Sequence, residues 1–220
     1  MAQQSPPNDT PGTDLFPGFG AVPAMVADEV AGLTDAQLDW VSDDWVWSQW
    51  SIRRQVAHIG SFIASWLLDR WGDHLFPGGL DSLGDLAAVV PTPEAEWHRT
   101  GQPWPLPVLL ERVDLSVRLA QHVLARETAA SLRAVEVERP NTPPHWRQFV
   151  NAHPTGVRWH PTEPNTTYID LEATFRHVYY ECITHLYNLQ RLKRAQGLQT
   201  AVELPREGYW QLPDWDRSEP

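Results

Sequence analysis

One long proline-free segment dominates the sequence: residues 171–196 read LEATFRHVYYECITHLYNLQRLKRAQ, and Gly197 follows. Its apolar residues recur at spacings of three and four, the period of one face of an α-helix. Gly197 stands where a glycine commonly ends a helix. The segment therefore predicts a long amphipathic helix. Its expected core face consists of Leu171, Phe175, Val178, Tyr179, Cys182, Leu186 and Leu189.

Proline marks where other helices can lie, because a proline inside a helix costs about 3 kcal/mol. The 20 prolines leave three long windows, and further amphipathic patterns begin in or beside them. Ser51 is a good N-cap residue, and Pro107 occupies a favoured first-turn position. Residues 135–137 are too short an extended stretch to define a sheet. We therefore expect an all-α fold, an antiparallel-type four-helix bundle with long proline-rich connections. Its helices are expected at residues 24–33, 51–72, 107–124 and 171–196.

The ends of the chain differ from this pattern, because they are rich in proline, glycine and acidic residues. We expect a flexible N-terminal segment at 1–20 and the bundle at 21–197. The tail at 198–220 carries Trp210 and Trp215, so it is expected to pack on or near the bundle.

Composition excludes several functional classes. The chain has 17 basic and 28 acidic residues and a net charge of −11, so it lacks the basic footprint of a nucleic-acid-binding protein. It has no apolar run of about 20 residues, as a membrane helix requires. A single cysteine, Cys182, excludes an intrachain disulfide framework and is expected to be inert packing. The first 15 residues do not resemble a secretory signal, and we expect a cytoplasmic protein.

Three residues lie at the margin of the expected core. At about 100° per residue, Glu181 and His185 fall one turn apart along the edge of their helix. His58 falls at a matching edge of the helix at 51–72. Two imidazoles and one carboxylate are the donor set of a catalytic zinc site, and they also suit Fe²⁺, Ni²⁺ or Mn²⁺. By spacing alone, a Glu–His pair of this kind is more often hydrogen-bonded or solvated than bound to a metal.

Two segments resemble the DinB/YfiT-like superfamily of metal-binding four-helix bundles: residues 50–59, WSIRRQVAHI, and residues 177–189, HVYYECITHLYNL. In that superfamily a Trp-Ser pair caps the second helix, and the histidine seven positions after the serine, here His58, binds metal. The last helix usually carries His-x3-His, from which Glu181 departs. It agrees with the branch that includes mycothiol-dependent maleylpyruvate isomerase, whose ligands are His, Glu and His. The resemblance implies that His58, Glu181 and His185 hold a divalent metal, zinc first.

The resemblance further implies a metal-dependent enzyme that uses a low-molecular-weight thiol against a small-molecule electrophile, as an S-transferase or a thiol-dependent isomerase. Arg54 and Asn188 are candidates to orient the thiol or the substrate. The alternatives are a metal-dependent hydrolase and a non-catalytic metal-binding or stress-response module. We expect neither a nucleic-acid nor a membrane partner.

Two further groups of residues have open interpretations. A second apolar stripe at Tyr180, Ile183 and Tyr187 needs a cover, which the chain's own tail or a second subunit could supply, and we expect a homodimer. His177 is expected to face solvent, with a supporting role beside the metal as the alternative. The segment 145–160 is rich in histidine and tryptophan and could form a lid or, less simply, a second zinc site.

Overall fold

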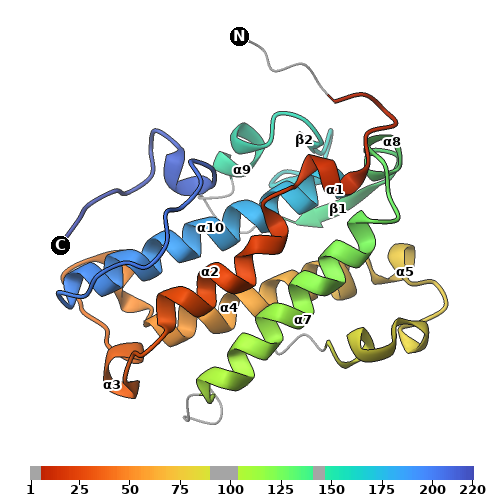
Figure 1. Cartoon of the computed structure of the whole chain (residues 1–220). Coiled ribbons are helices and arrows are strands. Elements are labelled where there is room, and N and C mark those ends of the chain that lie inside the picture. Colours follow the sequence, from red (N-terminus) through yellow and green to blue (C-terminus); the bar gives the residue numbers. More distant parts are fainter. Residues whose placement is uncertain (1–5, 90–103, 141–146) are drawn as a thin grey trace.

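Four long helices form the centre of the protein (Figure 1). The computed structural model describes residues 6–89, 104–140 and 147–220. The four helices are α2 (Val22–Val30), α4 (Ile52–Ser65), α7 (Leu106–Leu124) and α10 (Leu171–Ala195). Helices α2 and α4 each pack against α7 and α10. In Figure 1, α2 and α10 run in one direction and α4 and α7 in the other, so antiparallel and parallel contacts alternate.

The sequence predicts an all-α, antiparallel-type bundle, and the structure is mainly helical, with the four long helices close to their predicted positions. The antiparallel arrangement holds for α2 with α7 and for α4 with α10, whereas the other two contacts are parallel. The segment expected as a single helix at 51–72 is instead α4 followed by a π-helical turn, η3 (Trp66–Arg70). None of the helices in the described ranges is both long and apolar enough to cross a membrane. The shorter helical elements are α1 (Gly12–Leu15), η1 (Phe19–Ala21), α3 (Asp35–Leu38), η2 (Val46–Gln49), α5 (Gly72–Leu75), η4 (Asp81–Ala88), α8 (Ala129–Leu132), α9 (Arg147–Ala152) and η6 (Tyr209–Gln211).

Side-chain caps fix where the two helices of the candidate site begin. The Ser51 hydroxyl accepts the backbone N–H of Arg54 at 3.3 Å, as its N-cap position predicts. At the start of α10, Asp170 Oδ1 accepts the N–H of Ala173 at 2.7 Å. Gly197 follows α10 with φ of 70°, a left-handed conformation that glycine adopts without steric cost.

The expectation that no sheet forms is wrong. Strands β1 (Glu136–Pro140), β2 (Val157–Trp159) and β3 (Thr166–Asp170) form a three-stranded antiparallel sheet in the order β1-β3-β2. Ile169 on the central strand pairs with Val137 on one side and Val157 on the other. It is fully buried. Strands of three to five residues are too short to show a two-residue period, so the sequence pattern missed them.

The ends of the chain pack against the bundle. In the N-terminal segment that we expected to be flexible, Phe16 and Phe19 are buried in the core, which differs from that expectation. At the other end, the Trp210 ring stacks on Tyr187 at 4.6 Å, and Ile183 is fully buried. The tail therefore covers the second apolar stripe. The homodimer stays a prediction. Because the tail already covers the stripe, the stripe no longer supports it.

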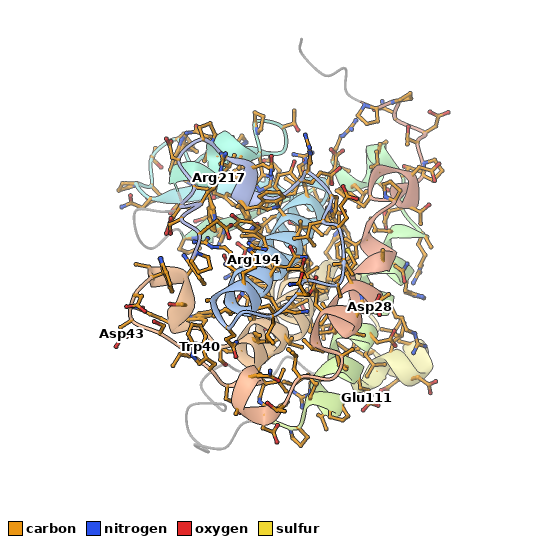
Figure 2. All side chains as sticks on the ribbon, turned by 60° about the vertical axis from the view of Figure 1, so that its left-hand side comes forward. Asp28, Trp40, Asp43, Glu111, Arg194 and Arg217 are labelled. Carbon is orange, nitrogen blue, oxygen red and sulfur yellow. The ribbon has the colours of Figure 1, made fainter. Side chains whose placement is uncertain are left out.

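Figure 2 shows the tail running beside α10, with Arg194 on the helix and Arg217 on the tail. Arg194 Nε donates to Glu219 Oε2 at 2.8 Å, and the Tyr187 hydroxyl donates to Glu219 Oε1 at 2.9 Å. Two side chains of α10 therefore bind the same tail carboxylate.

A buried ion pair joins α2, α10 and the start of the tail. Glu29 is fully buried and accepts hydrogen bonds from Lys193 Nζ at 2.6 Å and Gln190 Nε2 at 2.7 Å. It also accepts the backbone N–H groups of Ala201 and Val202, each at 3.0 Å. Burial raises the pKa of Glu29, but the hydrogen bonds from these groups outweigh it, so the net shift is downward.

We expect Glu29→Gln to lower the free energy of unfolding at pH 7 by about 3 kcal/mol, because Lys193 then stays buried without its counter-charge. Because the pKa of Glu29 is lowered in the folded protein, its ionised carboxylate stabilises the fold at pH values above the ordinary pKa of 4.5. This stabilisation is lost as the pH falls through the lowered pKa. Urea unfolding at stepped pH should therefore show the gap to wild type closing below about pH 4.5. The exposed Glu203→Gln is the control, and a pH-independent gap would contradict the prediction.

Candidate metal centre

The three residues singled out from the sequence lie together in the structure. One donor atom from each of His58, Glu181 and His185 can be chosen so that all lie within 4.8 Å of one another. His58 comes from α4, and the other two come from one side of α10, one turn apart. Glu181 Oε2 and His185 Nε2 are 3.2 Å apart, and the rings of His58 and His185 have centroids 4.5 Å apart. The packing of α4 on α10 therefore builds the cluster.

The cluster is half-buried. The side chains of Glu181 and His185 are 22% and 12% exposed, so both are partly accessible to solvent. Trp50 forms one wall: its ring stacks on His185 at 5.9 Å and meets His58 edge-on at 5.2 Å. Phe62 packs on the other side of His58, also at 5.2 Å. The donors thus lie between an aromatic wall and the bundle.

Gln55 fixes the orientation of His185. The Gln55 side chain is buried, and its amide oxygen accepts a hydrogen bond from His185 Nδ1. Because a carbonyl oxygen only accepts, the contact places a proton on Nδ1. The other nitrogen, Nε2, then faces the Glu181 carboxylate. Two acceptors 3.2 Å apart repel each other unless a proton or a metal cation lies between them.

This geometry fits a divalent metal. Zinc bonds to histidine and carboxylate are about 2.0–2.1 Å long, so tetrahedral ligands lie about 3.3 Å apart. The Glu181–His185 separation matches that value, and the remaining donors need only a small side-chain movement. A hydrogen bond to the distal nitrogen of a ligating histidine is the usual support in metal sites. Among the described residues, His58, Glu181 and His185 are the group that meets the distance requirement for a metal.

The two predicted substrate-orienting residues lie in different places. The Arg54 guanidinium lies 3.9 Å above the Trp50 ring, on the indole that borders the centre. Asn188 instead accepts a hydrogen bond from Arg191 at 3.4 Å. Arg191 in turn donates to the backbone oxygen of Asp216 in the tail at 2.9 Å. The structure therefore places Arg54 beside the donors and connects Asn188 to the anchoring of the tail.

The expectation that His177 faces solvent is wrong, because its side chain is fully buried. The rings of Phe149 and Trp66 lie 4.7 and 4.9 Å from its own, so α9 and η3 enclose the side of α10 that the helical pattern left open. Its Nδ1 lies 4.0 Å from Glu181 Oε1. Burial lowers the pKa of His177 well below its ordinary value.

Sequence reasoning missed several residues around the centre. Gln55 lies three residues before His58, so helical spacing alone could have placed it on the same face. His153, from the expected lid segment, is buried against Tyr209 of the tail, and no pattern in the sequence indicated that contact. His145, from the same segment, lies outside the described residues. Arg139 on β1 is also buried, and its guanidinium lies 4.8 Å from the Trp66 ring.

Charge and burial act together at Arg139 and Cys182. Burial, with the nearby positive charge of Arg70, lowers the pKa of Arg139 to about 10, while the Glu181 carboxylate opposes the shift. Arg139 therefore remains a cation at neutral pH. Burial raises the pKa of the Cys182 thiol, which lies in the core as expected of an inert packing residue.

In comparisons with known proteins, no family model, no curated protein and no solved structure matches the chain. The resemblance of residues 50–59 and 177–189 to the DinB/YfiT-like superfamily therefore stays a prediction. The arrangement of the three donors is independent of that resemblance, because it follows from the structure itself.

We expect Gln55→Leu to weaken zinc binding about tenfold, because His185 loses the acceptor that fixes its ring. Gln55→Glu keeps an acceptor at the same place and should retain most of the affinity. Competition with a chromophoric chelator measures both dissociation constants, with the exposed Gln121→Leu as the control. Equal affinity of the leucine variant and the wild type would contradict the assigned role of Gln55.

Proposed function

We propose that the chain is a cytoplasmic, metal-dependent enzyme of the DinB/YfiT-like type that uses a low-molecular-weight thiol to transfer or isomerise a small electrophile. The observation that carries the proposal is the convergence of His58, Glu181 and His185 from two packed helices. Three protein ligands are typical of catalytic zinc sites, in which a further position accepts water or substrate. Zinc is the first candidate metal, and Ni²⁺, Fe²⁺ and Mn²⁺ suit the same donors.

A divalent cation held by these residues would lower the pKa of a coordinated thiol, so that the thiol loses its proton near neutral pH. The chain's own residues do the rest. Gln55 keeps His185 Nε2 turned toward Glu181, and Trp50 offers an aromatic face next to both imidazoles. Arg54, stacked on that indole, places a positive charge beside the donors, where it suits an anionic group of the thiol or electrophile.

The metal part of this proposal predicts one zinc ion per chain. After treatment with a chelator and dialysis, titration with Zn²⁺ should give a stoichiometry near one. His58→Ala, Glu181→Gln and His185→Ala should each weaken binding at least about 100-fold, because the alanine variants lose a ligand and Glu181→Gln loses the negative charge of one. His74→Ala, which removes an exposed histidine, is the matched control. Uptake of no zinc by the wild type would overturn the proposal.

The catalytic part predicts that the fold survives metal removal. The core is formed by many buried apolar side chains, each contributing about 1.5–3 kcal/mol. Thermal melting followed by circular dichroism should therefore show a cooperative transition with and without chelator. A structural zinc would behave differently, because its binding energy is folding energy. Loss of helicity on chelation would indicate a structural, non-catalytic metal module.

A conjugation assay separates the thiol reaction from hydrolysis. Glutathione, cysteine and coenzyme A can be supplied in turn with 1-chloro-2,4-dinitrobenzene, and the zinc-loaded wild type should exceed Glu181→Gln with at least one thiol. Hydrolysis of p-nitrophenyl acetate without thiol, in the absence of any conjugation, would instead support the metal-dependent hydrolase. Activity in neither assay, with zinc bound and the fold intact, would support the binding module.

A further inference from the structure

The C-terminal tail inserts one side chain beside the candidate metal centre. Tyr209 of η6 is buried, and its backbone N–H donates to the Thr184 hydroxyl of α10 at 2.9 Å. Gly208, with φ of 105°, permits this close approach, since a Cβ there would lie 3.1 Å from Thr184 Oγ1. Figure 1 shows the tail returning along α10 toward α9. The backbone of Tyr209 is thus bound to α10 at Thr184, the residue before His185.

The Tyr209 hydroxyl lies between two buried imidazoles. It is 2.5 Å from His177 Nδ1 and 2.6 Å from His153 Nε2, and both histidine side chains are fully buried. Burial lowers the pKa of His153 to about 3 and the pKa of His177 well below its ordinary value, and it raises the pKa of Tyr209. All three groups are therefore neutral at physiological pH. The hydroxyl can donate to the facing nitrogen of one ring and accept from the facing nitrogen of the other.

The same His177 nitrogen faces the metal ligand Glu181. Nδ1 of His177 lies 4.0 Å from Glu181 Oε1, which is beyond hydrogen-bond distance. A single imidazole nitrogen makes one well-aligned hydrogen bond. Because Tyr209 engages Nδ1, the imidazole is kept from the Glu181 carboxylate. The other carboxylate oxygen remains 3.2 Å from His185 Nε2.

We propose that Tyr209 is a positioning residue for the metal centre: its hydroxyl engages His177 and so keeps the Glu181 carboxylate turned toward His185. The inference rests on the proposed metal site. It adds that the C-terminal tail, through this one hydroxyl, sets the affinity of the centre. Docking of the tail and binding of the metal are then coupled, because each favours the same position of Glu181.

Tyr209→Phe tests this step directly, because it removes the hydroxyl and keeps the ring in its pocket. Without the hydroxyl, Nδ1 of His177 can turn to another acceptor, and Glu181 Oε1 is 4.0 Å away. To form that hydrogen bond, the carboxylate would have to move toward His177, which would turn Oε2 away from His185 and from the metal position. We expect the dissociation constant for Zn²⁺ to rise about tenfold, the lower end of the range for loss of a supporting residue.

Tyr187→Phe is the matched control. Like Tyr209, Tyr187 is a buried tyrosine whose hydroxyl joins α10 to the tail. It lies on α10, and its hydroxyl donates to Glu219 Oε1 of the tail at 2.9 Å. The substitution therefore removes a hydroxyl and a tail contact without touching His177. We expect the zinc affinity of Tyr187→Phe to stay within twofold of wild type. The melting temperatures of Tyr187→Phe and Tyr209→Phe are compared in parallel to measure their effects on stability. A general loosening of the tail would weaken zinc binding equally in both.

Proteolysis gives a readout that does not depend on activity. Arg206 in the tail is exposed, and trypsin cleaves after arginine. By reciprocity, saturating Zn²⁺ should slow cleavage at Arg206 in the wild type and slow it much less in Tyr209→Phe. Unchanged zinc affinity in Tyr209→Phe, or an equal loss in Tyr187→Phe, overturns the inference while the metal site stands. Failure of the wild type to bind zinc, with Glu181→Gln indistinguishable from it, overturns the proposed function and this inference together.

Discussion

The burial of α10 on nearly every side is the constraint on which the rest of the structure depends. A helix enclosed by other elements must find a partner for every polar side chain it carries, because burying such a group unpaired costs free energy. Helix α10 carries many of them. Its buried or half-buried polar residues include Glu172, His177, Glu181, His185, Gln190, Arg191 and Lys193. Helices α2 and α4, the residue after α8 and the C-terminal tail supply partners to different parts of this helix.

Those partners follow the length of α10. Near its start, Glu172 pairs with Arg133, which follows α8, and with Arg176 one turn along α10. In the middle, His177 meets the tail through Tyr209, and His185 meets α4 through Gln55. Near its end, Lys193 pairs with Glu29 of α2. The candidate metal centre lies midway between two ionic clusters, on the stretch where the partners are neutral amide, imidazole and phenol groups.

The sequence indicated the helices and the three donors for one physical reason. Helical periodicity is a local property, and it fixes which residues of one helix share a face. Glu181 and His185 are related by one turn, and His58 needed only the further assumption that α4 packs on α10. The burial of His177 does not follow from the helical pattern of α10. Elements from distant parts of the chain enclose this side chain: α9, η3 and the tail. The strands were missed for a related reason. Ile169 pairs with Val137 and Val157 from distant parts of the chain, and such long-range pairing leaves no pattern in short segments.

The charges around the centre bear on the kind of ligand it would accept. His153, His177 and Tyr209 are neutral, so the charges that act from the buried side are the Glu181 carboxylate and the Arg139 guanidinium, with Arg70 nearby. Arg54 adds a positive charge on the Trp50 side. Adding a divalent cation to these groups leaves a net positive region in a half-buried site, where charges interact more strongly than in water.

Such a region stabilises a ligand that gives up a proton on binding. A thiol, whose ordinary pKa is about 8.5, does so far more readily near neutral pH than an alcohol. The electrostatics and the donor set are thus both compatible with the proposed thiol chemistry, for separate physical reasons.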